Sequence, residues 1–94
     1  MRKKYSDQLR ELIKKHFNTR QTRVFLFGSS VYGKKKFYDI DVGFLGKIDS
    51  KKLNQLCEEL EESTLPYEVD LVDFNQVKAS FKEYVFSQPV KWIK

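Results

Sequence analysis

Residues 24–41, VFLFGSSVYGKKKFYDID, decide the fold of this chain. The run from Val24 to Phe27 is apolar and rich in aromatic and branched side chains, which is typical of a buried strand. Gly28-Ser29 breaks this run and predicts a turn that leads into a short helical segment. A second strand-like run then begins with Asp39-Ile40-Asp41. The order is therefore strand, Gly-Ser turn, helical turn and a strand that carries Asp-x-Asp.

Two carboxylates share one face of this second strand. Residues two apart in a strand point the same way, so Asp39 and Asp41 lie about 7 Å apart along one face, while Ile40 points to the other. Two such carboxylates repel each other, and the packing of a strand does not require them. Gly43, on the same face, is expected to leave open space beside them. Because Mg²⁺ prefers hard oxygen ligands, the pattern predicts a metal site here.

A later segment, YEVDLVDF at residues 67–74, predicts a third strand from Tyr67 to Asp73. Strand alternation places Glu68 and Asp70 on one face and Asp73 on the other. A polar position in mid-strand marks the active face, which favours Asp70 as the third metal ligand. Asp73 stands at the end of the strand, where it is expected to serve the following turn.

Length and composition indicate one small domain that spans residues 1–94. The proportions of hydrophobic and charged residues, 40% and 33%, are ordinary for a globular protein. No stretch approaches the roughly 18 apolar residues of a membrane span, and the basic start has no apolar segment of a signal peptide behind it. The single cysteine, Cys57, has no internal disulfide partner, which fits a reducing compartment. We therefore expect a cytoplasmic protein without a membrane association.

The formal net charge is +5 and the isoelectric point is near 9.3. Such a charge suits an anionic ligand, either a nucleotide or nucleic acid, and does not choose between them. Nucleic acid is the less favoured of the two, because basic and aromatic residues do not alternate on one exposed strand.

The predicted elements indicate an α/β fold. We expect a small mixed sheet with helices packed mainly on one face and the carboxylate site at its edge. The expected helices are residues 5–17 with Ser6 as N-cap, residues 51–62 with Ser50 as N-cap, and a last helix capped by Asn75. The expected first two strands are Arg23 to Phe27 and Tyr38 to Leu45, and residues 90–94 form either a short edge strand or an interaction arm. In that tail, Trp92 either covers the core or waits for a partner. His16 and Cys57 lie on the apolar faces of their helices and are expected to pack in the core.

The order Gly28-Ser29, then Asp39 and Asp41, then Asp70 on a later strand resembles the signature of the minimal nucleotidyltransferases. This family belongs to the DNA polymerase β-like superfamily, and the resemblance covers nearly the whole chain. It implies the polymerase β-like nucleotidyltransferase fold. It also implies Mg²⁺-dependent transfer of a nucleoside monophosphate, AMP from ATP, to a hydroxyl of a protein or small-molecule acceptor.

The resemblance assigns roles to the residues that match the motif. Asp39 and Asp41 would hold the metal on the triphosphate side and share a second metal, whose shell Asp70 completes. Asp70 would also help to deprotonate the acceptor hydroxyl. Gly28 and Ser29 would grip the β- and γ-phosphates. Apart from the resemblance, at least two of the lysines at residues 34–36 are expected to lie in a solvated loop, and one of the three to reach either the triphosphate or an acidic partner. Such a two-metal arrangement activates the attacking oxygen and stabilises the leaving pyrophosphate.

Family members of this size are commonly encoded beside a helical partner, either a HEPN-type toxin or a substrate-binding subunit. In the toxin pairs, the transferase-like protein acts as antitoxin and can modify its partner. The alternative is a binding module with weak or absent catalysis that acts by contact with such a partner. Residues 30–32, Ser-Val-Tyr, stand where this family often carries arginine, which keeps that alternative open.

Overall fold

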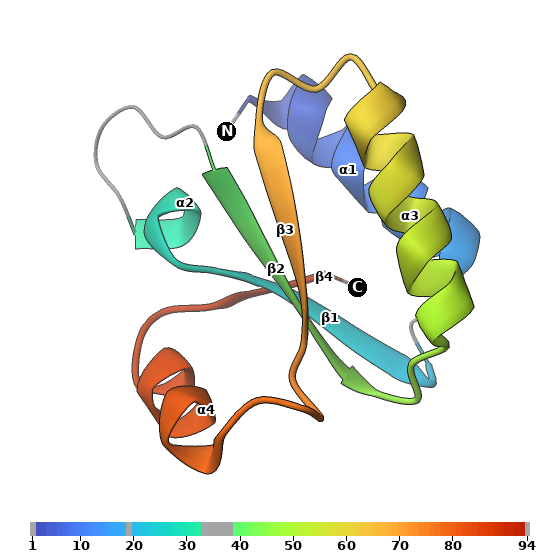
Figure 1. The fold of residues 1–94 in the computed structure, drawn as a ribbon. Helices are drawn as coiled ribbons and strands as arrows, with labels where there is room; N and C mark the ends of the chain where they lie inside the picture. The colour runs from blue at the N-terminus through green and yellow to red at the C-terminus, as the bar shows by residue number, and fades with distance from the viewer. Residues whose placement is uncertain (1, 19, 33–38, 94) are drawn as a thin grey trace.

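A computed structural model describes residues 2–18, 20–32 and 39–93 of the chain (Figure 1). The elements in chain order are α1 (Lys3–His16), β1 (Thr22–Phe27), α2 (Ser29–Tyr32), β2 (Asp39–Gly46), α3 (Ser50–Glu62), β3 (Glu68–Asp73), α4 (Ala79–Phe86) and β4 (Lys91–Ile93). The strands form one mixed sheet in the order β3-β2-β1-β4. β2 and β3 are parallel, and β1 is antiparallel to both β2 and β4.

One face of the sheet packs against α1 and α3, which lie side by side (Figure 1). The alternating apolar positions of β2 point into this layer, as the sequence predicts. The buried residues of this core are Leu9, Ile13, Phe17, Val24, Leu26, Ile40, Val42, Phe44, Leu56 and Leu60. Because α3 connects two parallel neighbouring strands, it has to cross over a sheet face, and burial of Leu56 and Leu60 fixes it there.

The opposite face is covered only in part. A second core of Phe25, Phe27, Phe74 and Val85 lies between the sheet and α4. The prediction of helices mainly on one face is therefore confirmed for α1 and α3, whereas α4 packs against the other face (Figure 1). Among the described helices, none is long and apolar enough to cross a membrane.

The three predicted N-caps are wrong. Ser6 lies inside the first turn of α1, since its N–H donates to the carbonyl of Arg2 over 3.0 Å. α3 is capped by Asp49, whose side chain accepts from the Lys51 N–H at 2.9 Å. Asn75 instead donates through Nδ2 to the Gly46 carbonyl at 2.8 Å, so it ties the loop after β3 to the end of β2. α4 then begins only at Ala79.

The C-terminal segment is an edge strand, and Trp92 covers the core. Trp92 is paired with Phe25 across β1 and β4, and their ring centroids lie 5.1 Å apart. The Arg23 guanidinium lies over the indole, 4.5 Å from its centroid.

The expectation of open space at Gly43 is wrong, because the Phe25 ring lies 2.3 Å from where a Cβ on Gly43 would stand. Gly43 thus makes room for a core phenylalanine.

His16 joins the two helices of the covered face. Its side chain is only 11% exposed, and its Nε2 lies 3.2 Å from Glu59 Oε2 on α3. Lys15 Nζ lies 2.9 Å from the other oxygen of the same carboxylate. This position fits the predicted packing role of His16.

Candidate active site

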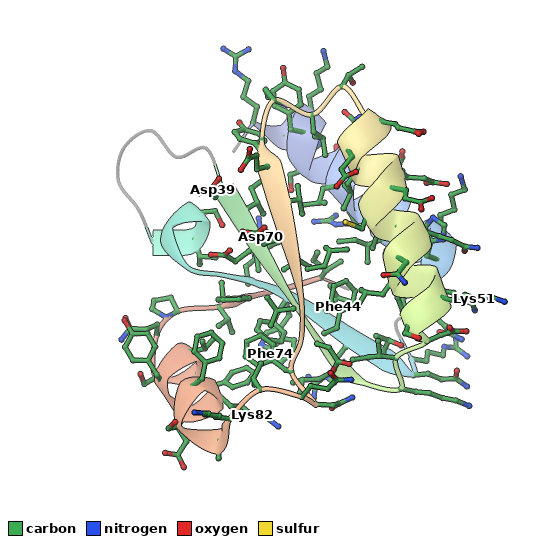
Figure 2. All side chains as sticks on the ribbon, in the orientation of Figure 1. Asp39, Phe44, Lys51, Asp70, Phe74 and Lys82 are labelled. Atoms are coloured by element: carbon green, nitrogen blue, oxygen red, sulfur yellow. The ribbon has the colours of Figure 1, made fainter. Side chains whose placement is uncertain are left out.

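The register of the sheet brings the predicted aspartates together. Asp41 of β2 is directly opposite Asp70 of the parallel strand β3, and Asp39 is opposite Glu68. Paired residues on neighbouring strands point to the same face, and alternation puts Asp39 and Asp41 on that face together. Figure 2 shows Asp39 and Asp70 on these two adjacent strands. The sheet therefore carries its carboxylates on the face that α1 and α3 do not cover.

The three aspartates differ in their surroundings. Asp39 and Asp70 are exposed, whereas Asp41 is half-buried. Burial raises the pKa of Asp41 above its ordinary value, and the neighbouring charges of Asp70 and Asp39 raise it further. Asp41 is therefore the middle one of the three carboxylates, and a cation beside it would relieve the most repulsion.

The glycine turn closes over Asp41 from the next strand. Phe27, the last residue of β1, is paired with Asp41, and Gly28 follows it with a φ of +80°. A Cβ at Gly28 would stand 2.5 Å from Asp41 Oδ2, which is closer than a side chain can approach. The Val31 N–H donates to the Gly28 carbonyl at 3.0 Å, and α2 starts at Ser29. The backbone angle favours glycine here, and any Cβ would displace the Asp41 carboxylate from its position.

The carboxylate oxygens of Asp39, Asp41 and Asp70 are suitable ligands for a hard divalent cation. Within the described residues, no three His, Cys, Asp or Glu side chains are already placed as a closed set of metal ligands. Asp39 and Asp70 are nevertheless near enough to Asp41 to raise its pKa, and both are exposed, so their side chains can rotate toward it. Carboxylate oxygens are the ligands that Mg²⁺ and Mn²⁺ prefer.

A fourth carboxylate of this face, Glu68, was not among the predicted site residues. Glu68 is exposed and stands opposite Asp39. Strand alternation already placed Glu68 with Asp70, but only the parallel register between β2 and β3 shows that it is beside Asp39. The lysines of residues 34–36, of which one is expected to reach the triphosphate or an acidic partner, lie outside the described residues.

Comparisons with known proteins show the family to which the chain belongs. A family model described as "Polymerase beta, Nucleotidyltransferase" matches residues 7–91. The chain is 37% identical over 65 residues to a probable protein adenylyltransferase MntA from Haemophilus influenzae. That match covers 66% of this chain and 57% of the relative, so the chain spans just over half of the relative's length.

Solved structures share the fold. A crystal structure of a toxin–antitoxin with AMP-PNP matches with a TM-score of 0.71 at 24% identity, over 94% of this chain and 71% of the other. A chain of the structure of a tri-AMPylated Shewanella oneidensis HEPN toxin in complex with MNT antitoxin matches with a TM-score of 0.71 at 23% identity. This match covers all of this chain and 72% of the other.

Proposed function

Because the chain belongs to the polymerase beta nucleotidyltransferase family, we propose that it transfers a nucleoside monophosphate, AMP from ATP, to a hydroxyl group. The observation that carries this proposal is the pairing of Asp41 with Asp70, with Asp39 on the same face and the Gly28 turn against Asp41. A carboxylate row beside a glycine turn is suited to holding a metal-bound triphosphate. Position and charge neutralisation are what nucleotidyl transfer mainly needs.

Asp39, Asp41 and Asp70 are the proposed metal ligands, and Mg²⁺ is the proposed metal. Bound there, divalent cations would neutralise the triphosphate and activate the attacking hydroxyl. The hydroxyl oxygen forms a bond to the α-phosphorus, the bond to the β-phosphate oxygen breaks, and pyrophosphate leaves. Asp70 is exposed on strand β3, at the edge of the sheet, and from there it can accept the proton of the incoming hydroxyl. Gly28 and Ser29 form the turn against which the β- and γ-phosphates would lie, since glycine lets them approach the backbone.

The acceptor is proposed to be a protein. The Haemophilus relative is named a probable protein adenylyltransferase, and one structural neighbour is an AMPylated HEPN toxin with its antitoxin. We infer a helical HEPN-type partner for this chain as well, with the chain acting as its antitoxin in the cytoplasm. The modified group would be a hydroxyl of that partner.

The test uses the HEPN toxin of the Shewanella pair as the acceptor. It is incubated with the purified protein, ATP and Mg²⁺, and its intact mass is measured. We expect one or more AMP masses on the partner with the wild type and none with the Asp39→Asn, Asp41→Asn variant, which should still bind. If no nucleotide adds mass and the variant neutralises the toxin as well as the wild type, the protein is a binding module instead. Ser30 and Val31, in positions where an arginine is common in this family, are what favour that second function.

A further inference from the structure

β3 is the outer strand of the sheet, and its free edge carries backbone groups that no strand pairs. The order β3-β2-β1-β4 leaves one side of β3 without a neighbouring strand in the part of the chain that the structure describes. The Phe74 N–H donates to the Phe44 carbonyl at 2.9 Å, so alternation along β3 directs the N–H and C=O groups of Val69 and Leu71 away from β2. No other described segment forms backbone hydrogen bonds to these groups. The edge can therefore accept a further strand.

A groove lies along this edge of β3. It measures about 390 Å³ and is lined by Leu60, Glu61 and Leu65, from the end of α3 and the loop after it, and by residues 67–70. Because Asp70 is one of these residues, the groove opens onto the proposed metal site. A segment bound in the groove would therefore lie beside the proposed site of nucleotidyl transfer.

The groove is acidic, although the formal net charge of the chain is +5. The exposed carboxylates Glu61, Glu68 and Asp70 line it, and no lysine or arginine does so within the described residues. Burial raises the pKa of the Cys57 thiol on α3, and the charges of Glu61 and Asp70 are among those that raise it further. The carboxylates of α3 and β3 thus act on one region. With Asp70 engaged by a metal ion, Glu61 and Glu68 remain for a cationic side chain.

We propose that the free edge of β3 binds an extended, basic segment of the acceptor protein by strand addition, and that this segment carries the hydroxyl. The role of the hydroxyl rests on the proposed function, whereas the docking rests on the edge itself. A strand added to β3 lies about 4.8 Å from it, and its side chains alternate between the two faces. Glu68 and Asp70 share one face, so a residue opposite Asp70 has its next neighbour on that face opposite Glu68. The edge therefore fits a hydroxyl residue with a lysine or arginine two positions away.

The docking test uses a short blocked peptide with tyrosine at its centre, lysine two residues to either side and valine elsewhere. Its binding is measured by fluorescence anisotropy without nucleotide or metal, so the measurement does not depend on the proposed transfer. Glu61→Lys reverses one charge in the groove. Glu62→Lys is the matched control, because Glu62 is the next residue of α3, is also exposed and does not line the groove.

We expect Glu61→Lys to weaken peptide binding about tenfold or more, and Glu62→Lys to change it by less than about twofold. A peptide with glutamate in place of lysine should not bind. Two further peptides carry N-methyl groups on alternate residues, one at the odd and the other at the even positions. Only the peptide whose methyl groups face β3 should lose binding, because strand addition uses the N–H groups on that side alone.

Equal weakening by Glu61→Lys and Glu62→Lys would reduce the effect to overall charge and overturn the docking edge, as would binding that neither methylated peptide loses. With ATP and Mg²⁺, the peptide tyrosine should gain an AMP mass. AMP on the Shewanella HEPN toxin, with the basic peptide unbound, would overturn the docking edge and leave the proposed function standing. Peptide binding with the expected variant pattern, but no AMP on peptide or toxin, would overturn the proposed function and the role of the hydroxyl, and leave the docking edge standing.

Discussion

Asp41 and Asp70 lie directly opposite each other on two parallel strands, with one carboxylate half-buried and the other exposed. This arrangement destabilises the protein when no cation is bound, since like charges on paired positions repel. The apolar β2 positions on the opposite face hold the strand in register through a buried core, so the repulsion cannot be relieved by moving the strand. The proposed cation site would relieve this repulsion.

Asp41→Asn should therefore stabilise the unliganded protein at neutral pH. The substitution removes the charge from the centre of the row and keeps the shape of the side chain. The gain should stay below about 1 kcal/mol because the carboxylate is partly solvated, which corresponds to at most about 4–8 °C in melting temperature. Thermal unfolding without divalent ions measures it. A variant that is less stable than the wild type would show that Asp41 has a structural role.

The effect of Asp41→Asn on stability should depend on pH. Since the folded-state pKa of Asp41 is raised, its protonated form is favoured by folding, and the wild type loses stability as the pH rises through that pKa. The difference in melting temperature between Asp41→Asn and the wild type should be largest near pH 7. It should shrink as the pH falls toward the ordinary aspartate value of 3.8. A difference that grows on acidification would contradict the assigned shift.

Ligand-induced stabilisation should depend on the Asp-x-Asp pair. Mg²⁺ with ATP should raise the melting temperature of the wild type, with about 2.7 kcal/mol of added stability at a ligand concentration of 100 times Kd. Asp39→Asn with Asp41→Asn should remove this increment and leave the unliganded fold intact or slightly more stable. An undiminished increment in the double variant would rule out these carboxylates as the metal site.

Asp70 and Asp73, on the same strand, should give opposite phenotypes. Asp70→Asn should abolish nucleotidyl transfer with little change in stability, since Asp70 is exposed beside Asp41. Asp73 Oδ1 accepts the Asn75 N–H at 2.9 Å, so Asp73→Ala should cost about 0.5–1.5 kcal/mol and leave activity per folded molecule unchanged. Chemical denaturation and the transfer assay distinguish the two. The reverse pattern would mean that Asp73 belongs to the site.

The sequence predicts on which face of the sheet each of these aspartates lies, because that signal is local. Alternation along one strand places Asp39 with Asp41 and separates Asp70 from Asp73, and both assignments are confirmed by the register. The predicted turn role of Asp73 is confirmed by its bond to Asn75.

The rest depends on pairing between distant segments. The sequence does not reveal that β2 and β3 are parallel with Asp39 opposite Glu68, or that the Phe25 ring occupies the space above Gly43. The N-cap predictions were wrong for a similar reason. Asn75 has the chemistry of a cap, yet the end of β2 competes for its amide.

Two glycines have a positive φ, Gly28 at +80° and Gly46 at +91°. Substitution of either by alanine should lower the free energy of unfolding by about 1–2 kcal/mol, because the left-handed backbone disfavours a Cβ.

The two substitutions should differ in their effect on ligand binding. At Gly28 the added Cβ meets the Asp41 carboxylate, which can rotate away, so the protein should fold but lose its Mg²⁺·ATP binding. At Gly46 the Cβ would lie 2.5 Å from the backbone carbonyl of Gln21, which cannot rotate away, so Gly46→Ala should lose at least as much stability. Its folded fraction should still bind Mg²⁺·ATP, because Gly46 lies at the opposite end of β2 from Asp39 and Asp41. Denaturation curves and calorimetry on both variants measure the two effects separately, and equal ligand binding by Gly28→Ala and the wild type would remove the glycine turn from the site.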